Sequence, residues 1–147
     1  TALNQDIIDK ATISFKNSVE LDSNNINAKI KLAQCYMELK NEPMQGVQGL
    51  LSIVKKDSMN IPANLLLAKF GLISGQYEKV LPRLKKVLSL QPSNVEALLL
   101  NADAHAQTGK SDVAIKNLET ILGLKNVAPE MKKEITAALS ELKKQHK

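Results

Sequence analysis

The stretch Ser-Gly-Gln-Tyr-Glu-Lys-Val at residues 74–80 has a counterpart 34 residues later, Thr-Gly-Lys-Ser-Asp-Val-Ala at residues 108–114. Each stretch begins with a hydroxyl residue and a glycine, continues with polar and acidic residues, and contains a small aliphatic residue near its end. Glycine suits the left-handed backbone that follows a helix. Two such turns at one fixed distance indicate that the chain repeats a structural unit.

The spacing of 34 residues continues on both sides of the turn. Leu84 and Leu118, for example, are 34 residues apart. A third copy lies upstream, where Leu32 precedes Leu67 by 35 residues, and we place the one extra residue near residues 42–43. A fixed period of this length is typical of proteins built from stacked repeats.

Each copy is predicted to form two helices. In the middle copy the first helix begins near Pro62, since proline is tolerated at a helix start, and it ends at Gly75. The second helix runs from about Tyr77 to Leu90, and its apolar residues follow the three- and four-residue spacing of one helical face. Pro92 then ends this helix.

Two details of the helix ends can be predicted as well. Ser93 or Asn94 is expected to cap the helix that follows. Pro82 falls within the second helix, where an interior proline costs about 3 kcal/mol. We therefore expect Pro82 near the helix start or at a slight kink.

The unit resembles the tetratricopeptide repeat (TPR). The best copy spans residues 61–94, with Leu67-Ala68 as the small-residue pair of the first helix and Gly75-Gln76-Tyr77 as the turn. The segment that ends this copy is Leu90-Gln91-Pro92-Ser93-Asn94. In the next copy, Asn101 and His105 stand where the repeat usually has an apolar and an aromatic residue. The resemblance implies an all-α fold, a right-handed α-α superhelix of about three helical hairpins plus leading and C-terminal capping helices.

The resemblance covers nearly the whole chain, as a single TPR-like repeat domain over residues 1–147. We divide the domain into a partial repeat at 1–25, mainly its second helix, full repeats at 26–60, 61–94 and 95–128, and a capping helix with a tail at 129–147. Because the first helix of the leading repeat is missing or reduced to residues 2–8, we interpret the chain as a piece of a longer array.

Composition excludes two further structural features. The single cysteine, Cys35, excludes an internal disulfide, and no apolar run reaches the roughly 20 residues of a membrane span. The compartment stays open between the cytoplasm and, if an upstream leader or anchor was removed, the bacterial periplasm or envelope. Oligomeric state is equally open.

No catalytic or metal-binding motif is present, so we predict neither enzyme activity nor a cofactor. Asn101 and His105 lie one helical turn apart and are interpreted as a half-buried polar pair, bonded to each other or to backbone. The other histidine, His146, falls in a tail expected to fray. Cys35 is interpreted as a small buried thiol.

The basic charge is concentrated in the middle of the chain. The formal net charge is +5, and Lys79, Arg83 and Lys86 lie on one stripe of a second helix. Nucleic acid is one possible partner for such a patch. However, the chain has one arginine against 19 lysines and only 3% aromatic residues. It therefore offers few guanidinium groups for bidentate phosphate contacts and few aromatic rings for base stacking. We therefore expect no nucleic acid.

The first helices of such repeats line a concave wall, and their positions outside the core point into its groove. An apolar row, Ile30, Leu65 and Leu99, is expected across three of these helices, and an exposed apolar row indicates a groove for a peptide or helix. The predicted partner-binding residues of the groove are Ile30, Gln34, Met37, Leu65, Lys69, Leu72, Leu99 and Asp103.

The predicted function is a non-catalytic protein-protein interaction module, or scaffold, that binds a partner helix or an extended apolar segment in this groove. The partner is a protein or peptide. Two alternatives remain: a structural array that forms a homo-oligomer through its inner face and, less favoured by the composition, a basic helical repeat that binds nucleic acid.

Overall fold

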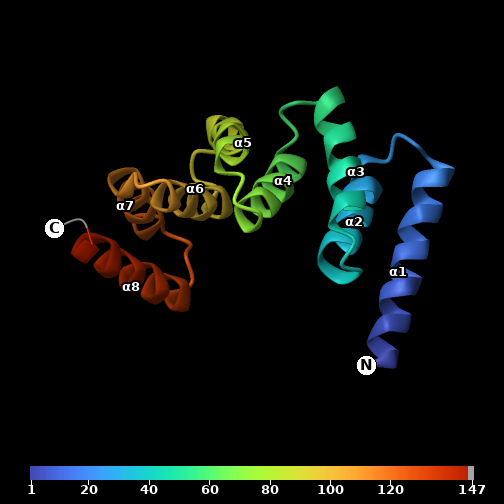
Figure 1. Ribbon diagram of the computed structural model, residues 1–147, viewed down its shortest axis with the longest axis horizontal. Coiled ribbons are helices and arrows are strands. Elements are labelled where there is room, and N and C mark those ends of the chain that lie inside the picture. The colour runs from blue at the N-terminus through green and yellow to red at the C-terminus, as the bar shows by residue number, and fades with distance from the viewer. Residues whose placement is uncertain (146–147) are drawn as a thin grey trace. The chain divides into compact units, whose positions relative to one another are not determined.

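The computed structural model describes residues 1–145, and these residues form helices joined by short turns, with no strand among them (Figure 1). His146 and the last residue of the predicted capping segment lie outside the described residues. The all-α class predicted from the sequence is confirmed. The helices are α1 (Ala2–Leu21), α2 (Ile26–Gln34), the π-helical η1 (Cys35–Leu39), α3 (Pro43–Lys56), α4 (Ile61–Ile73), α5 (Tyr77–Leu90), α6 (Val95–Gln107), α7 (Ser111–Leu122) and α8 (Pro129–Gln145).

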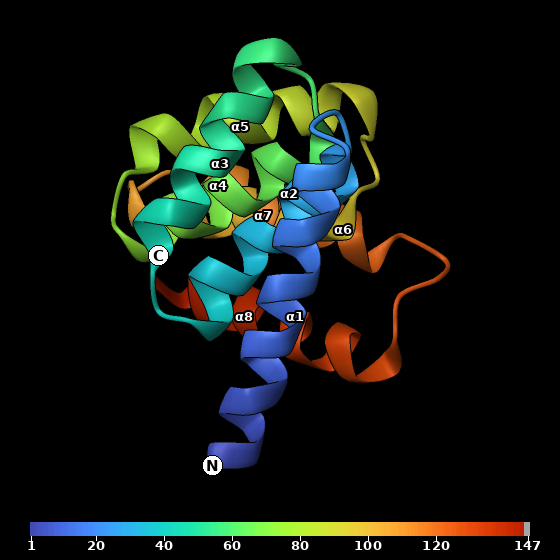
Figure 2. The same ribbon diagram turned by 90° about the vertical axis from the view of Figure 1, so that its right-hand side faces the viewer.

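The chain divides into two compact units, Thr1–Leu67 and Ala68–Lys147. In the first unit α2 packs against both α1 and α3, and η1 continues α2 along the same two neighbours (Figure 2). Its apolar core contains Ile30, Leu50, Ile53 and Leu66, which are at most 9% exposed.

In the second unit α6 packs against α5 and α7, and α8 packs against α7. The core of these helices includes Leu98, Leu118, Ile121 and Ile135, and all of them are buried. As the composition requires, the core side chains are aliphatic.

The same asparagine cap starts the first helix of each predicted repeat. Asn25, Asn60 and Asn94 each accept a hydrogen bond through the side-chain oxygen from the backbone N–H three residues later, at 3.0, 3.1 and 2.9 Å. Such a cap satisfies one of the backbone donors that every helix start leaves free, and is worth about 1 kcal/mol. Asn94, one of the two expected cap residues, is therefore the cap of α6. The division of the chain into repeats at residues 26, 61 and 95 remains a prediction.

The turns inside the hairpins use a left-handed residue at equivalent positions. Gly75 and Gly109 have φ angles of 71° and 78°, and Asn41 takes the same place in the first hairpin with a φ of 53°. Asparagine is the residue that best tolerates this conformation after glycine. The left-handed backbone of the turn explains why the sequence repeats its glycine.

The extra residue of the first copy lies at the end of the α2–η1 segment. In the later hairpins the closing hydrogen bond spans five residues, from Gln76 N–H to Gly71 O and from Lys110 N–H to His105 O. In the first hairpin the corresponding bond, from Glu42 N–H to Tyr36 O, spans six. Residues 35–39 accommodate the insertion by widening into a π-helical turn, as a one-residue insertion in a helix does.

Two local details can be compared with the sequence analysis. The first helix of the leading repeat was expected to be missing or reduced to residues 2–8, and residues 2–8 form the start of one continuous helix of 20 residues, α1, from Ala2 to Leu21. Pro82 was expected near the helix start or at a slight kink, and it lies in the second turn of α5, five residues after Tyr77. Because proline has no N–H, the carbonyl of Glu78 loses its usual donor there.

Candidate interaction surface

The predicted groove residues of the first unit are less accessible than expected. Ile30 belongs to the apolar core and is 7% exposed, and Leu65 is 9% exposed. The expectation that these two side chains are exposed is therefore wrong, and their role in binding a partner stays a prediction. The apolar row across three first helices remains a prediction.

Gln34 and Met37 lie at the junction of α2 and η1. Gln34 is half-buried, and its side-chain oxygen accepts a hydrogen bond from Lys31 Nζ at 3.3 Å. Met37 is half-buried and packs against the core that contains Ile30. Met37 therefore contributes to the core packing of the first unit, and only part of its side chain is accessible to a partner.

Lys69 and Leu72 lie on α4, one turn apart. Lys69 is exposed and Leu72 is half-buried. Ile73, the next residue, is 79% exposed and is the most accessible large apolar side chain of this helix. The role of these residues in binding stays a prediction.

Leu99 and Asp103 come together at one hollow of the second unit. The hollow has a volume of about 220 Å³ and lies among α6, α7 and α8. Both residues project from α6, one turn apart, and the remaining lining is apolar. The full lining is Leu99, Ala102, Asp103, Ala106, Leu118, Ala138 and Leu142.

The hollow exists because small residues stand where larger ones would fill the space. Ala102 and Ala106 contribute only methyl groups from α6, and Ala138 does the same from α8. Leu99, Leu118 and Leu142 supply the apolar surface between them. Asp103 is exposed, so its carboxylate is the polar edge of the hollow.

Two polar contacts lie beside this hollow. Gln107 donates through Nε2 to the carboxylate of Asp103 at 3.4 Å. Lys143, the neighbour of Leu142, forms an ion pair of 2.8 Å with Glu119 and so ties α8 to α7. Both partners of this pair are about half exposed, and a pair of that kind contributes at most about 1 kcal/mol.

A second hollow, of about 570 Å³, lies between α5 and α6 of the same unit. Its lining is Leu81, Pro82, Lys85, Leu88, Asn101 and His105. The sequence interpretation had Asn101 and His105 hydrogen-bonded to each other or to backbone. In the structure the Nδ1 atom of His105 is buried and has no hydrogen-bond partner among the described residues, so that interpretation is wrong for this atom.

The environment of His105 favours the uncharged imidazole. Burial lowers the pKa of His105, and the positive charge of Lys110 lowers it further. A neutral imidazole carries one donor and one acceptor nitrogen. His105 therefore offers a hydrogen-bonding group without adding charge to the hollow.

Residues 1–145 hold no cluster of histidine, cysteine and acidic side chains that would bind a metal ion. Cys35 is buried, as predicted. No described helix is long and apolar enough to cross a membrane.

Residues 72–142 match the family model described as tetratricopeptide repeat. This segment is therefore similar to tetratricopeptide repeats. The matched TPR residues run from the end of α4 into α8, so they include both hollows of the second unit. A comparison with curated protein sequences finds no match.

Solved structures of TPR proteins and related chains share the fold. Two crystal structures of MamA each have a TM-score of 0.72 and 19% identity; they cover 92% and 95% of this chain and 81% and 79% of their own. The thermophilic TPR protein TTC0263 of Thermus thermophilus has a TM-score of 0.69 and 19% identity, over 96% of this chain and 78% of its own. The TPR-like fold is thus found over nearly the whole chain.

The sequence interpretation missed part of the hollow. Ala138 and Leu142 fall in the predicted capping helix and tail at 129–147, and Leu118 was noted only as the repeat equivalent of Leu84. One signal was present in the sequence: Ala138 and Leu142 are four residues apart, opposite Ala102 and Ala106 with the same spacing. Residues four apart lie on the same face of a helix, so each of these pairs is presented on a single helix face.

Proposed function

We propose that the chain is a non-catalytic protein-interaction module, and that the hollow among α6, α7 and α8 takes an apolar side chain of a partner segment. The observation that carries the proposal is the lining itself, six apolar residues with a single exposed carboxylate at the edge. The family supports the class, because TPR arrays present preformed surfaces to protein partners.

Water in this hollow is easily displaced. A volume of about 220 Å³ is roughly seven times the ~30 Å³ that a water molecule occupies in the liquid. The apolar lining offers such water few hydrogen bonds, and replacing poorly bound water with an apolar group favours binding. Burying one leucine-sized side chain contributes about 1.5–3 kcal/mol.

Asp103 indicates what the rest of the partner segment carries. An exposed carboxylate beside an apolar site attracts a lysine or arginine and repels an acidic residue. The partner we propose is therefore an amphipathic helix, or an extended segment, that places a cationic residue within a few positions of its apolar anchor. Leu99 and Asp103 are then the contact residues, as predicted from the sequence.

Peptide selection tests this function. A displayed library of amphipathic helices is selected on the full chain, and the selected peptides are measured against two variants. Ala138→Trp fills the hollow, whereas Ala137→Trp places the same ring on a neighbouring exposed residue of α8 that does not line it. We expect peptides with a Leu or Ile anchor and a Lys or Arg, and a loss of at least about tenfold in affinity with Ala138→Trp alone. Failure to select any peptide, or equal binding to both variants, contradicts the proposal.

Self-assembly is the competing use of the same surface. Light scattering on the full chain over a range of concentrations distinguishes the two. A dimer that Ala138→Trp dissociates and Ala137→Trp leaves intact would assign the hollow to a second copy of the chain.

A further inference from the structure

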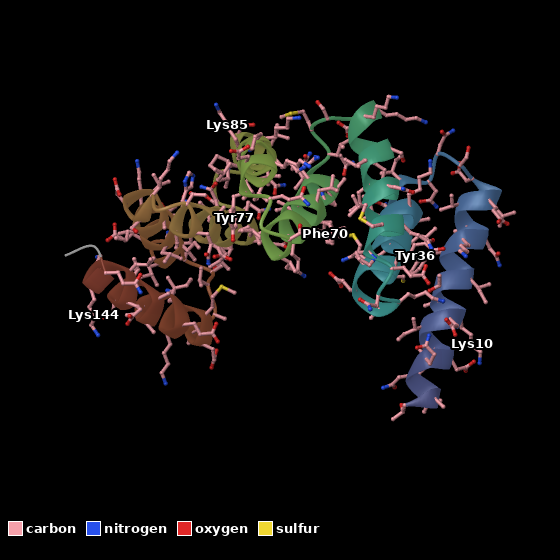
Figure 3. The ribbon with its side chains drawn as sticks, in the orientation of Figure 1. Lys10, Tyr36, Phe70, Tyr77, Lys85 and Lys144 are labelled. Atoms are coloured by element: carbon pink, nitrogen blue, oxygen red, sulfur yellow. The ribbon has the colours of Figure 1, made fainter. Side chains whose placement is uncertain are left out.

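The α5–α6 hollow has properties that the proposed function does not use. It lies between two helices that pack against each other, yet it remains open beside the exposed Pro82 and Lys85. Lys85 projects from α5 (Figure 3). The volume of about 570 Å³ falls within the range of about 300–1,000 Å³ that is usual for ligand clefts.

Two residues of the lining depart from the repeat. The positions of Asn101 and His105 usually hold an apolar and an aromatic residue, which would pack against the preceding helix. In the middle copy the residue equivalent to Asn101 is Leu67, which is buried. The polar pair at these positions lines the helix–helix junction with hydrogen-bonding groups.

The Nδ1 atom of His105 is buried and lacks a hydrogen-bond partner among the described residues. A buried polar atom without a partner costs about 1–3 kcal/mol, so an isolated unbonded Nδ1 is unfavourable in the free protein. The described residues supply no hydrogen bond to Nδ1, and the rest of the His105 side chain lines the hollow. The only hydroxyl nearby in sequence, Thr108, instead donates to the backbone carbonyls of Ala104 and His105.

The charge around the hollow has one sign. Lys85 is the charged residue of its lining, and no carboxylate belongs to the lining. Lys110 acts on His105 from the turn after α6. A negatively charged group is therefore attracted to this hollow, whereas a lysine or arginine is repelled.

The apolar part of the lining decides between a bare anion and a larger ligand. Leu81 and Leu88 lie two turns apart on α5, with Pro82 beside them, and they offer a surface that an ion alone would leave uncovered. We propose that the α5–α6 hollow is a second binding site, for a partner peptide that carries an apolar or aromatic side chain next to an aspartate or glutamate. The apolar group covers Leu81, Pro82 and Leu88, and the carboxylate meets Lys85 and the polar groups of Asn101 and His105.

This site and the α6–α8 hollow select opposite charges. Asp103 favours a cationic flank, whereas Lys85 favours an acidic one. The second site stands on its own observations and does not depend on the function proposed for the first.

Nuclear magnetic resonance of the full chain tests the second site with three small probes: acetyl-Phe-Glu-amide, acetyl-Phe-Gln-amide and acetyl-Phe-Lys-amide. We expect the glutamate probe to shift the amides of residues 81–88 and 101–105 at the lowest concentration, and the lysine probe to bind about fivefold more weakly or not at all. Inorganic phosphate is titrated separately, because a phosphate site and a nucleic-acid site share that anion.

Reversing the charge of Lys85 tests the site, with the same reversal at a residue outside the hollow as the control. Lys85→Glu should reverse the order of the glutamate and lysine probes. The control Lys116→Glu makes the same change on an exposed residue of α7 that does not line the hollow, and it should leave the order unchanged. His105→Phe removes the polar ring nitrogens and should weaken binding of the glutamate probe; circular dichroism shows whether that variant folds, and Lys85→Glu carries the test if it does not.

The possible outcomes are distinct. Shifts at residues 81–88 and 101–105 that follow the charge of the probe and reverse with Lys85→Glu support the site. Equal shifts with all three probes, shifts confined to other residues, or no shifts overturn it. Phosphate that shifts the same amides as strongly as the glutamate probe also overturns it, and assigns the hollow to simple anions.

Discussion

The ammonium group of Lys40 lies 2.7 Å from the carboxylate of Asp9, and this ion pair joins α1 to the residue that follows η1. The two residues are 31 positions apart in the sequence. Close by, Lys16 of α1 lies 5.6 Å from the centre of the Tyr36 ring on η1, and Figure 3 shows Tyr36 on the side of η1 toward α1. The leading helix is thus held to its neighbour by polar as well as apolar contacts.

The pair makes the docking of α1 depend on pH. The hydrogen bond from Lys40 lowers the pKa of Asp9, so the stabilisation from Asp9 is present above its unfolded pKa and is lost as pH falls through the folded one. The bond to Asp9 raises the pKa of Lys40, so that contribution is lost as pH rises through the raised value. We expect Asp9→Asn to increase amide hydrogen exchange of α1 at neutral pH. The variant should also lack the further increase in exchange that the wild type shows as pH falls through the pKa of Asp9.

A matched control lies on the same helix. Asp6 pairs with Lys10 at 2.7 Å within α1 and makes no tertiary link. Asp6→Asn should leave exchange in η1 unaffected, whereas Asp9→Asn should raise it. Equal effects of the two variants on η1 would show that the Asp9–Lys40 pair does not hold α1 in place.

The two glycines of the first unit's α3 are predicted to respond oppositely to alanine. A Cβ atom at Gly46 would lie 2.6 Å from the carbonyl oxygen of Ala33 and would clash with the side chain of Met37. A Cβ at Gly49 would have only Ala33 Cβ nearby, at 3.9 Å, an ordinary contact. We expect Gly46→Ala to destabilise by about 1–3 kcal/mol and Gly49→Ala to stabilise by up to about 1 kcal/mol in denaturant unfolding. Stabilisation by both substitutions would contradict the close approach of α3 to α2.

The left-handed turn residues give another comparison. Gly75→Ala and Gly109→Ala should each destabilise the fold by about 1–2 kcal/mol, because both positions have positive φ angles. The space around both positions is open, so the added Cβ atom meets no other atom and the cost comes from the backbone conformation alone. Asn41→Gly should be neutral or stabilising for the same reason. Thermal unfolding of the three variants measures this, and unchanged midpoints for the two alanine variants would be incompatible with the turns described.

His105 should give the second unit a pH dependence of its own. Because its pKa is lowered below the ordinary 6.5, the unfolded chain binds more protons than the folded one near that pH. Stability therefore rises with pH through this window. As pH falls stability is lost, because the unfolded chain binds the proton while folded His105 stays neutral, and the loss is complete once His105 is charged in the folded state as well. We expect the free energy of unfolding to fall from about pH 8 to about pH 5 by a smaller amount in His105→Gln than in the wild type. Identical pH profiles would show that His105 is not desolvated.

The helices and their turns could be read from the sequence because local chemistry determines them. The Gly75 and Gly109 turns and the Asn94 cap each depend on residues within a few positions of one another. The π-helical turn at residues 35–39 was not predictable beyond the extra residue itself, since a bulge and a longer loop absorb an insertion equally well.

The accessible side of a first helix could not be read in the same way. Helix α4 has Leu65, Leu66 and Leu67 in succession, so it is apolar on every side and its sequence does not show which side is covered. On α6, by contrast, the exposed Glu96 and Asp103 mark a side that faces solvent, and the binding role of Leu99 and Asp103 stays a prediction.

The most direct measurement of the central claim is the contact between a partner peptide and the leucines of the α6–α8 hollow. A peptide selected on the full chain is mixed with protein that carries labelled leucine methyl groups, and nuclear Overhauser effects between the two are recorded. We expect effects from the peptide's apolar anchor to the methyls of Leu99, Leu118 and Leu142, and their loss in Ala138→Trp but not in Ala137→Trp. Effects from the anchor to other leucines only, with none to these three, would contradict the claim that this hollow binds the partner.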